Sequence, residues 1–191
     1  MERIYPTNKE IDKCIQTRRL DNHIERYLII KRYCFGKVLD LACGIGYGCY
    51  ILENNPDIES ILGVDIDYES IRIANNQFAT EKVKFELGNI LNYNQKHDVL
   101  VSLETIEHVK NLDQYFQMIQ RVDPKIIILS FPNKKSTHFN KFHEHDLNSQ
   151  QIVKLIKGYV LVNQTYQHDI TIMVFIKSPE GLPDHLFDTI V

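Results

Sequence analysis

VLDLACGIGYG, residues 38–48, is the stretch of sequence that decides the fold of this chain. It opens with a short apolar run, interrupted by Asp40, of the kind found in strands buried inside a sheet. The glycines at 44, 46 and 48 have no Cβ, so the backbone can turn tightly and a ligand can approach it. The helix predicted over residues 46–53 begins with unpaired N–H groups, which suit an anion. The stretch therefore predicts a strand, a glycine loop and a helix that together bind a ligand.

Helical and extended patterns alternate on both sides of this loop. Residues 10–34 carry apolar side chains at helical spacing, and Asp21 or Asn22 is the predicted cap of the second of two helices there. The predicted strands cover residues 38–41, 60–64, 83–87, 98–103, 126–131, 159–166 and 170–177. The predicted helices after the glycine loop cover residues 46–53, 68–78, 112–122 and 149–157.

Such alternation predicts the α/β class, with a doubly wound and mostly parallel sheet of seven strands. The last two strands have no helix between them, which predicts one antiparallel edge strand. The length of 191 residues fits a single domain, 1–191. We divide it into a helical cap (1–35), a core (36–177) and a tail (178–191). Loops at the carboxyl ends of the strands form the ligand site in sheets of this type.

The bulk composition narrows the class of protein. Hydrophobic residues make up 43% and charged residues 25% of the chain, and the net charge is −3, so nothing points to a nucleic-acid partner. No apolar run approaches the roughly 18–20 residues of a membrane span, and the polar N-terminus has no signal-peptide core. The four cysteines form no C-x-x-C pair. We expect free thiols and a cytoplasmic location.

A carboxylate follows the glycine loop at a spacing that is typical of nucleoside-binding sites. Asp65 ends the second predicted strand, 21 residues after Gly44. An acid at that place can accept hydrogen bonds from both ribose hydroxyls of an adenosine. A dinucleotide fingerprint requires glycine or alanine at position 49, and Cys49 stands there, which disfavours NAD. The loop alone is equally a tight turn, and Asp65 alone equally a helix N-cap, but together they predict a nucleoside-type ligand.

Residues 38–48 resemble motif I of the class I S-adenosylmethionine (SAM)-dependent methyltransferases. Asp40 matches its acid, Gly44 and Gly46 match its second and third glycines, and Ala42 departs from it at the first. The resemblance implies a Rossmann-like fold, SAM as the cofactor and S-adenosylhomocysteine as the product. It also implies that residues 40–46 wrap the methionine part of SAM.

Three more segments resemble motifs II, III and IV of this family, at residues 64–66, 88–90 and 97–109 (HDVLVSLETIEHV). They imply that Asp65 binds the ribose, that Ile66 lies against the adenine, and that Leu103 and Glu104 lie near the sulfonium. The cofactor residues expected from the whole resemblance, which covers residues 23–131, are Tyr27, Asp40, Ala42, Cys43, Gly44, Gly46, Asp65, Ile66, Asn89, Ile90 and Leu103.

Two flanking stretches resemble bacterial small-molecule and surface-glycan methyltransferases. Residues 21–30 (DNHIERYLII) are similar to their entry helix, which implies that Arg26 or Tyr27 closes over the methionine carboxylate. Residues 133–147 (NKKSTHFNKFHEHDL) are similar to the loop after their fifth strand, with matches at Phe142, His143 and Asp146. The acceptor implied is a small molecule, such as a sugar or a nucleotide-sugar.

Methyl transfer to a hydroxyl requires a group that removes its proton, and a neutral histidine suits that role. The candidates for catalysis are His108, His143 and Glu104, the last as an orienting carboxylate. A structural role for each histidine is equally consistent with the sequence. His138, His143, His145 and Asp146 form the densest metal-like cluster, but their spacing matches no closed zinc pattern, so we expect no metal.

The leading hypothesis is an O-methyltransferase that acts on a sugar or sugar-linked metabolite in glycan biosynthesis. An N-methyltransferase or another small-molecule methyltransferase on the same scaffold is the alternative enzyme. A SAM-binding module without catalysis, acting on a partner, is the alternative outside enzymes. A dinucleotide oxidoreductase ranks third. We expect the tail from Ser178 to Val191 to pack either on the domain or on a second subunit, so a homodimer is an open alternative.

Overall fold

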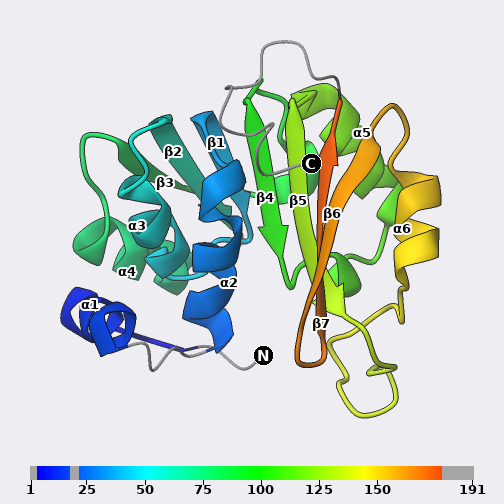
Figure 1. The fold of residues 1–191 in the computed structure, drawn as a ribbon, viewed down its shortest axis with the longest axis horizontal. Helices are drawn as coiled ribbons and strands as arrows, with labels where there is room; N and C mark the ends of the chain where they lie inside the picture. Colours follow the sequence, from blue (N-terminus) through cyan, green and yellow to red (C-terminus); the bar gives the residue numbers. More distant parts are fainter. Residues whose placement is uncertain (1–3, 18–21, 178–191) are drawn as a thin grey trace. The chain divides into compact units, whose positions relative to one another are not determined.

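A computed structural model of the chain describes residues 4–17 and 22–177 (Figure 1). The predicted cap at Asp21 and the predicted tail, 178–191, lie outside the described residues. The chain divides into two compact units, Met1–Ile90 and Leu91–Val191. We describe each unit by itself, and the assignment of both to a single domain stays a prediction.

The first unit carries the glycine loop between its first strand and the helix that follows it (blue to cyan-green in Figure 1). Strand β1 pairs in parallel with β2, and β2 in parallel with β3. Helix α4 begins where Asp67 accepts a hydrogen bond from the backbone of Ser70. The elements of this unit are α1 (Asn8–Thr17), α2 (Asn22–Ile30), η1 (Lys31–Tyr33), β1 (Gly36–Leu41), α3 (Tyr47–Glu53), β2 (Ile58–Asp65), α4 (Tyr68–Gln77) and β3 (Val83–Leu87).

The second unit pairs β4 with β5 in parallel, and β7 with both β5 and β6 in antiparallel register. Helix α6 starts with a capping box between Asn148 and Gln151, as the predicted cap at Asn148 requires. A turn with His168 at positive φ joins β6 to β7, the orange-red hairpin of Figure 1. The elements are η2 (Ile90–Asn92), which begins on the last residue of the first unit, β4 (Val99–Leu103), η3 (Ile106–His108), α5 (Leu112–Val122), β5 (Ile126–Pro132), α6 (Ser149–Leu155), β6 (Val160–Gln167) and β7 (Ile170–Ile176).

The predicted fold class is confirmed, since the strands form a seven-stranded α/β sheet in the order β3-β2-β1-β4-β5-β7-β6. The place of the antiparallel strand differs from the prediction. It is β7, which lies one position in from the edge, and β6 is the edge strand. Composition explains the exchange: β7 (ITIMVFI) is buried almost throughout, whereas β6 (VLVNQTYQ) carries polar side chains that tolerate an edge.

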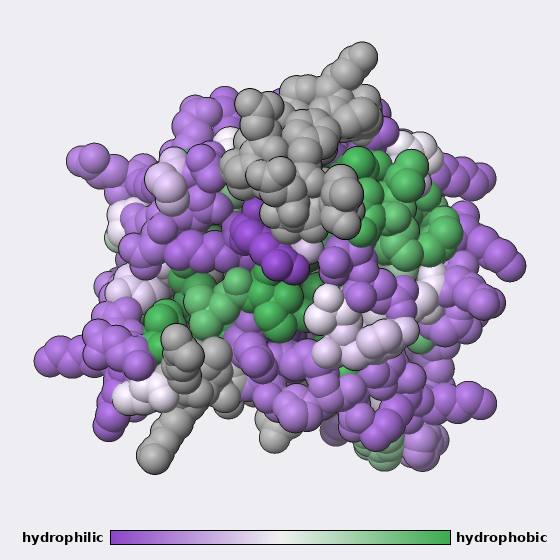
Figure 2. Space-filling view, in the orientation of Figure 1, coloured by the Kyte–Doolittle hydropathy of each residue, from purple (hydrophilic) through white to green (hydrophobic). Residues whose placement is uncertain are grey.

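The described surface drawn in Figure 2 is mostly hydrophilic, and the cysteines are free thiols. On the face drawn in Figure 2, hydrophilic residues cover most of the described surface, and apolar residues form separate patches. All four cysteines are free thiols, as predicted, and Cys34, Cys43 and Cys49 are buried. Within the described part of the chain, none of the helices has the length and apolar character needed to cross a membrane.

Candidate functional site

The glycine loop after β1 is held in a left-handed backbone conformation at three positions. The φ angles are +57° at Ala42, +56° at Gly44 and +87° at Gly46. A Cβ on Gly46 would lie 2.6 Å from the ring of Phe85 and 2.9 Å from the Cβ of Ala74, so only glycine fits there. A Cβ on Gly44 would meet nothing within 4 Å. Gly44 therefore borders open space, which is where a ligand can touch the loop.

Asp65, at the end of β2, is bonded directly to this loop. Its Oδ2 accepts a hydrogen bond of 2.8 Å from the backbone N–H of Gly44, and its Oδ1 accepts one of 2.9 Å from the N–H of Asp67. The alternative that Asp65 caps the next helix is excluded, since Asp67 is that cap. Each carboxylate oxygen has a second lone pair, so the predicted bonds to a ribose are compatible with these contacts.

Asp40 is fully buried behind the loop, where two neighbours donate to it. The Tyr27 hydroxyl donates a bond of 3.0 Å to Oδ2, and the Cys49 thiol donates one of 3.3 Å to the same oxygen. Burial raises the pKa of Asp40 from its ordinary 3.8 to about 7, against the lowering effect of these hydrogen bonds. Asp40 therefore supports the loop from inside the unit, and contact with SAM stays a prediction for it.

Tyr27 links α2 to the loop. A Cβ on Gly48 would lie 2.0 Å from the Tyr27 ring, so the absence of a side chain at 48 makes room for it. The ring also packs edge to face against Tyr47 at 5.7 Å. The Tyr27 hydroxyl is directed at Asp40. The closure of Tyr27 over the methionine carboxylate stays a prediction. Its neighbour Arg26 lies 3.5 Å from a ring nitrogen of His23.

Apolar side chains are exposed where β2 and β3 end. Ile66 is 71% exposed, Tyr68 64% and Leu87 54%, and Leu87 is the register partner of Asp65. Large apolar groups in water beside a carboxylate that is predicted to bind a ribose could take the flat face of an adenine. Ile66 was predicted for that role, whereas Tyr68 and Leu87 were not; each is an apolar residue at or shortly after the end of a strand. Asn89 is exposed and Ile90 half-buried.

In the second unit, Glu104 follows β4 with a φ of +50°. Its N–H donates to the carbonyl and the hydroxyl of Ser130, and the Ser130 hydroxyl donates to Glu104 Oε1 at 2.7 Å. Glu104 is therefore fastened to β5. That Glu104 orients a histidine stays a prediction. Leu103, the last residue of β4, is half-buried.

His108 and His143, predicted from distant parts of the sequence, lie together. Their ring centroids are 4.7 Å apart in an edge-to-face arrangement. His108 Nδ1 donates to the carbonyl of Phe142 at 2.9 Å, and His143 Nδ1 shares a 2.6 Å hydrogen bond with Ser136 Oγ. Burial and the neighbouring His108 lower the pKa of His143, so its neutral form prevails near pH 7.

Glu107 completes this cluster. Its side chain is only 2% exposed, and its Oε1 lies 4.0 Å from His108 Nε2. One ligand atom each from Glu107, His108 and His143 lie within 4.8 Å of one another. The segment is also tied to the loop after β5, because the N–H of Glu144 donates to the Glu107 carbonyl at 2.7 Å. We refer to Glu107, His108 and His143 as the histidine cluster.

The other members of the sequence cluster hold the loop in place. Asp146 accepts bonds from the backbone of Ser136 and Thr137 and from the Thr137 hydroxyl, and these bonds lower its pKa to about 2. His145 Nε2 donates to the Val109 carbonyl at 2.9 Å. Among the described residues these two groups are anchors, and the metal-like grouping is the histidine cluster instead.

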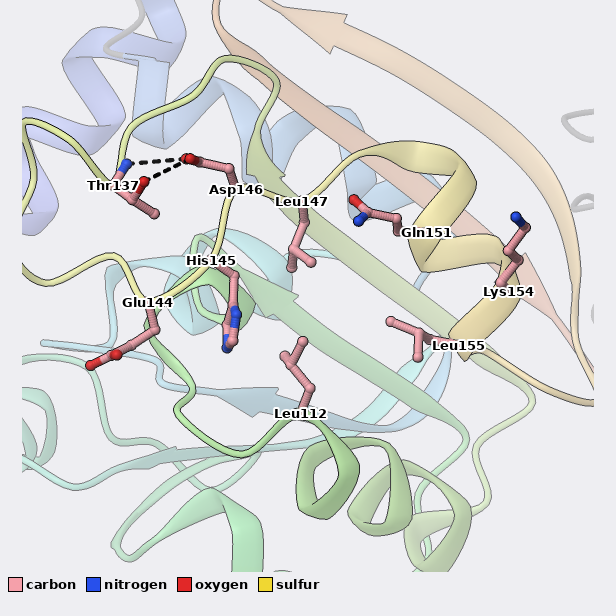
Figure 3. A pocket seen from close by; sticks show the side chains of 9 residues that line it. All are labelled: Leu112, Thr137, Glu144, His145, Asp146, Leu147, Gln151, Lys154 and Leu155. Carbon is pink, nitrogen blue, oxygen red and sulfur yellow. Dashed lines mark hydrogen bonds between the residues drawn. The ribbon is translucent and has the colours of Figure 1, made fainter.

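An open pocket of about 630 Å³ lies between this loop, the start of α5 and helix α6 (Figure 3). Leu112, Leu147 and Leu155 give it an apolar part, and charged or polar side chains give it the rest. No local sequence pattern indicates this pocket, because its lining comes from separate segments of the chain. Its lining consists of Leu112, Thr137, Glu144, His145, Asp146, Leu147, Gln151, Lys154 and Leu155.

Comparisons with known proteins point to one family. A family model described as a methyltransferase domain matches residues 36–173. Norajmaline N-methyltransferase from Rauvolfia serpentina is 30% identical over 107 residues, which cover 51% of this chain and 36% of that enzyme. Cyclopropane-fatty-acyl-phospholipid synthase from Escherichia coli is 32% identical over 108 residues, which cover 54% of this chain and 28% of that enzyme. The chain thus spans a minor part of the length of either relative.

A solved structure extends the likeness over most of the fold. Magnesium protoporphyrin IX methyltransferase from Synechocystis, determined with bound SAM, superposes with a TM-score of 0.67 at 16% identity. The match covers 92% of this chain and 87% of that one. At this identity the likeness establishes the shared fold alone.

Proposed function

Because this chain belongs to the methyltransferase-domain family, we propose that it transfers the methyl group of SAM to an oxygen of a small polar acceptor, such as a sugar or a sugar-linked metabolite. SAM is the cofactor, as the glycine loop and its acid predicted. The observation that carries the proposal is the bond between Gly44 N–H and Asp65, which joins the loop to the acid beside an exposed apolar surface.

The cofactor half of the proposal follows from that geometry. The open space at Gly44 takes the methionine part, Asp65 takes the ribose, and Ile66, Tyr68 and Leu87 take the adenine. Asp65 is already held by hydrogen bonds from the N–H groups of Gly44 and Asp67, so little conformational entropy of this side chain is lost on binding.

The acceptor half is assigned to the histidine cluster. In methyl transfer the acceptor oxygen attacks the methyl carbon, the carbon–sulfur bond breaks, and its electron pair stays on sulfur as S-adenosylhomocysteine forms. The hydroxyl proton must leave in the same step or before it. His143, neutral near pH 7, is suited to receive it. The pocket beside the loop, with Gln151 and Lys154 over an apolar part, supports a small polar acceptor.

N-methylation is the second candidate, favoured by the sequence likeness to norajmaline N-methyltransferase. An amine acceptor would use the same cofactor residues and would depend less on a general base to remove its proton. A homodimer, a cytoplasmic location and a role in glycan biosynthesis stay predictions from the sequence.

Calorimetric titration with SAM and with S-adenosylhomocysteine tests the first half. We expect micromolar binding of both, at least a tenfold loss in Asp65→Ala, and no change in Asp113→Asn, a matched carboxylate exposed on α5. Absence of binding to either compound by the wild type would refute the proposal.

A panel of sugar, nucleotide-sugar, phenol and amine acceptors, with products identified by mass, then separates O- from N-methylation. Tight SAM binding with no product from any acceptor would favour the module without catalysis.

A further inference from the structure

The histidine cluster has the composition of a metal site. Two imidazoles and one carboxylate come from segments about 35 residues apart and meet with their ligand atoms within 4.8 Å. Glu107 and His108 belong to η3, and His143 belongs to the loop after β5. Imidazole nitrogens and a carboxylate oxygen are ligand types that divalent transition ions bind in proteins.

The second nitrogen of each imidazole is already engaged. A carbonyl oxygen only accepts hydrogen bonds, so the bond from His108 to Phe142 requires a proton on Nδ1 and leaves the lone pair on Nε2. The Ser136 hydroxyl can accept from His143 Nδ1 in the same way, which leaves Nε2 of His143 as the ligand atom. Metal-binding histidines are characteristically oriented by such a bond to a carbonyl or an oxygen behind them.

The supports of the cluster are themselves held in place. Ser136, which orients His143, has its own N–H bonded to Asp146 at 2.6 Å. Glu107 is held through its carbonyl by the N–H of Glu144. The Glu107 side chain is buried at 2% exposure, whereas that of His108 is 23% exposed. The cluster thus combines a buried anionic ligand with an imidazole that solvent can reach, which gives an ion a route of entry.

We propose that Glu107, His108 and His143 bind one divalent first-row transition ion, of the class of Mn²⁺, Co²⁺ or Zn²⁺. Imidazole ligands favour these ions over Mg²⁺ and Ca²⁺, which prefer oxygen ligands alone. Bonds of about 2.1 Å place the donors of one ion roughly 3.0–3.5 Å apart. The 4.0 Å between Glu107 Oε1 and His108 Nε2 must therefore shorten by about 0.5–1 Å, which side-chain rotation can supply.

Three protein ligands leave coordination positions open, and an acceptor hydroxyl can fill one of them. This functional extension, unlike the ion site itself, rests on the proposed function. The ion would lower the pKa of a coordinated acceptor hydroxyl, whose proton would pass to solvent. The acceptor oxygen would then attack the methyl carbon, and sulfur would keep the electron pair of the broken carbon–sulfur bond. With the ion bound, His143 would be a ligand, and the ion would replace it in the proton-removing role that the proposed function assigns to it.

Cobalt titration tests the site without SAM. The full chain, stripped with a chelator, is titrated with Co²⁺ while the visible d–d absorption is recorded. We expect one equivalent to bind the wild type, with affinity at least tenfold lower in His143→Gln and in His108→Ala. His138→Ala, a histidine in the same loop outside the cluster, should bind like the wild type. Because Glu107 is buried, the cobalt affinity of Glu107→Gln is interpreted only if its far-ultraviolet circular dichroism shows that the variant is folded.

Binding of Co²⁺ that is equal in the wild type, His143→Gln and His108→Ala would overturn the proposal, and so would no binding at millimolar Co²⁺. SAM titration in the presence of the chelator separates the two claims. SAM binding that persists without the ion, with turnover restored only by added Mn²⁺ or Co²⁺, supports both. If the wild type binds cobalt but does not bind SAM, the proposed function is refuted and the proposed ion site is still supported.

Discussion

Alanine substitutions at two glycines of the same loop should affect different properties: Gly46→Ala mainly lowers stability, and Gly44→Ala mainly lowers the affinity for SAM. Gly46→Ala places a Cβ 2.6 Å from the ring of Phe85, which is only 7% exposed and cannot move aside. Overpacking of that kind costs about 1–3 kcal/mol, and a φ of +87° adds about 1–2 kcal/mol for an L-residue. We expect the free energy of unfolding to fall by about 2–5 kcal/mol.

Gly44→Ala is the matched control, because its φ is +56° and its Cβ would meet nothing within 4 Å. Only the backbone cost of about 1–2 kcal/mol applies to its stability. The new methyl group occupies the open space assigned to SAM, so the affinity for SAM should fall at least tenfold. Gly46→Ala, where enough protein stays folded to titrate, should lose affinity only in proportion to its folded fraction.

Urea unfolding followed by circular dichroism gives both free energies, and calorimetry at a temperature where each variant is folded gives both affinities. Equal losses of stability in the two variants would refute the packing argument at Gly46. Unchanged SAM affinity in Gly44→Ala would refute the assignment of the open space to the cofactor.

Four further substitutions, at Asp40, Tyr27, Ala42 and Asp146, test other parts of the structure. Asp40 has its pKa raised from 3.8 to about 7, so the stability it contributes is complete below pH 3.8 and is lost as the pH rises through 7. Over that range the free energy of unfolding should fall by up to about 4 kcal/mol, at about 1.4 kcal/mol per pH unit, and Asp40→Asn should remove the slope in urea titrations. Tyr27→Phe removes a donor to Asp40 and should cost about 1–2 kcal/mol at pH 8 by the same measurement, whereas an unchanged value would show that the bond contributes nothing. Ala42→Gly relieves a φ of +57° and should raise the urea midpoint, by up to about 1 kcal/mol in free energy. Asp146, with a pKa of about 2, stabilises its loop above about pH 4 and loses that effect as the pH falls through 2; Asp146→Asn should speed proteolysis within residues 133–148 at pH 7, and equal cleavage rates would count against the anchor.

Local patterns were enough to predict the cofactor half of this protein. An apolar strand, glycines at fixed spacing and an acid 21 residues later specify a βαβ unit by backbone sterics and short-range geometry alone. Asp65 ends β2 and Gly44 lies in the loop after β1, as predicted, and the structure adds the hydrogen bond that joins them. The helix caps at Asn148 and Asp67 are also local interactions, and Asn148 was predicted for that reason.

Tertiary structure decided what depends on contacts between distant segments. No local pattern shows that Tyr27 and Cys49 converge on Asp40, or that burial moves its pKa to about 7. The order of β6 and β7 depends on which strand is better buried beside β5. Proximity in sequence grouped His143 with His145 and Asp146, whereas folding placed it against His108 and Glu107, because side chains that are neighbours along a loop point in different directions. The sequence alone therefore determined the glycine loop and the class of fold, and only the folded chain decided which histidines lie together.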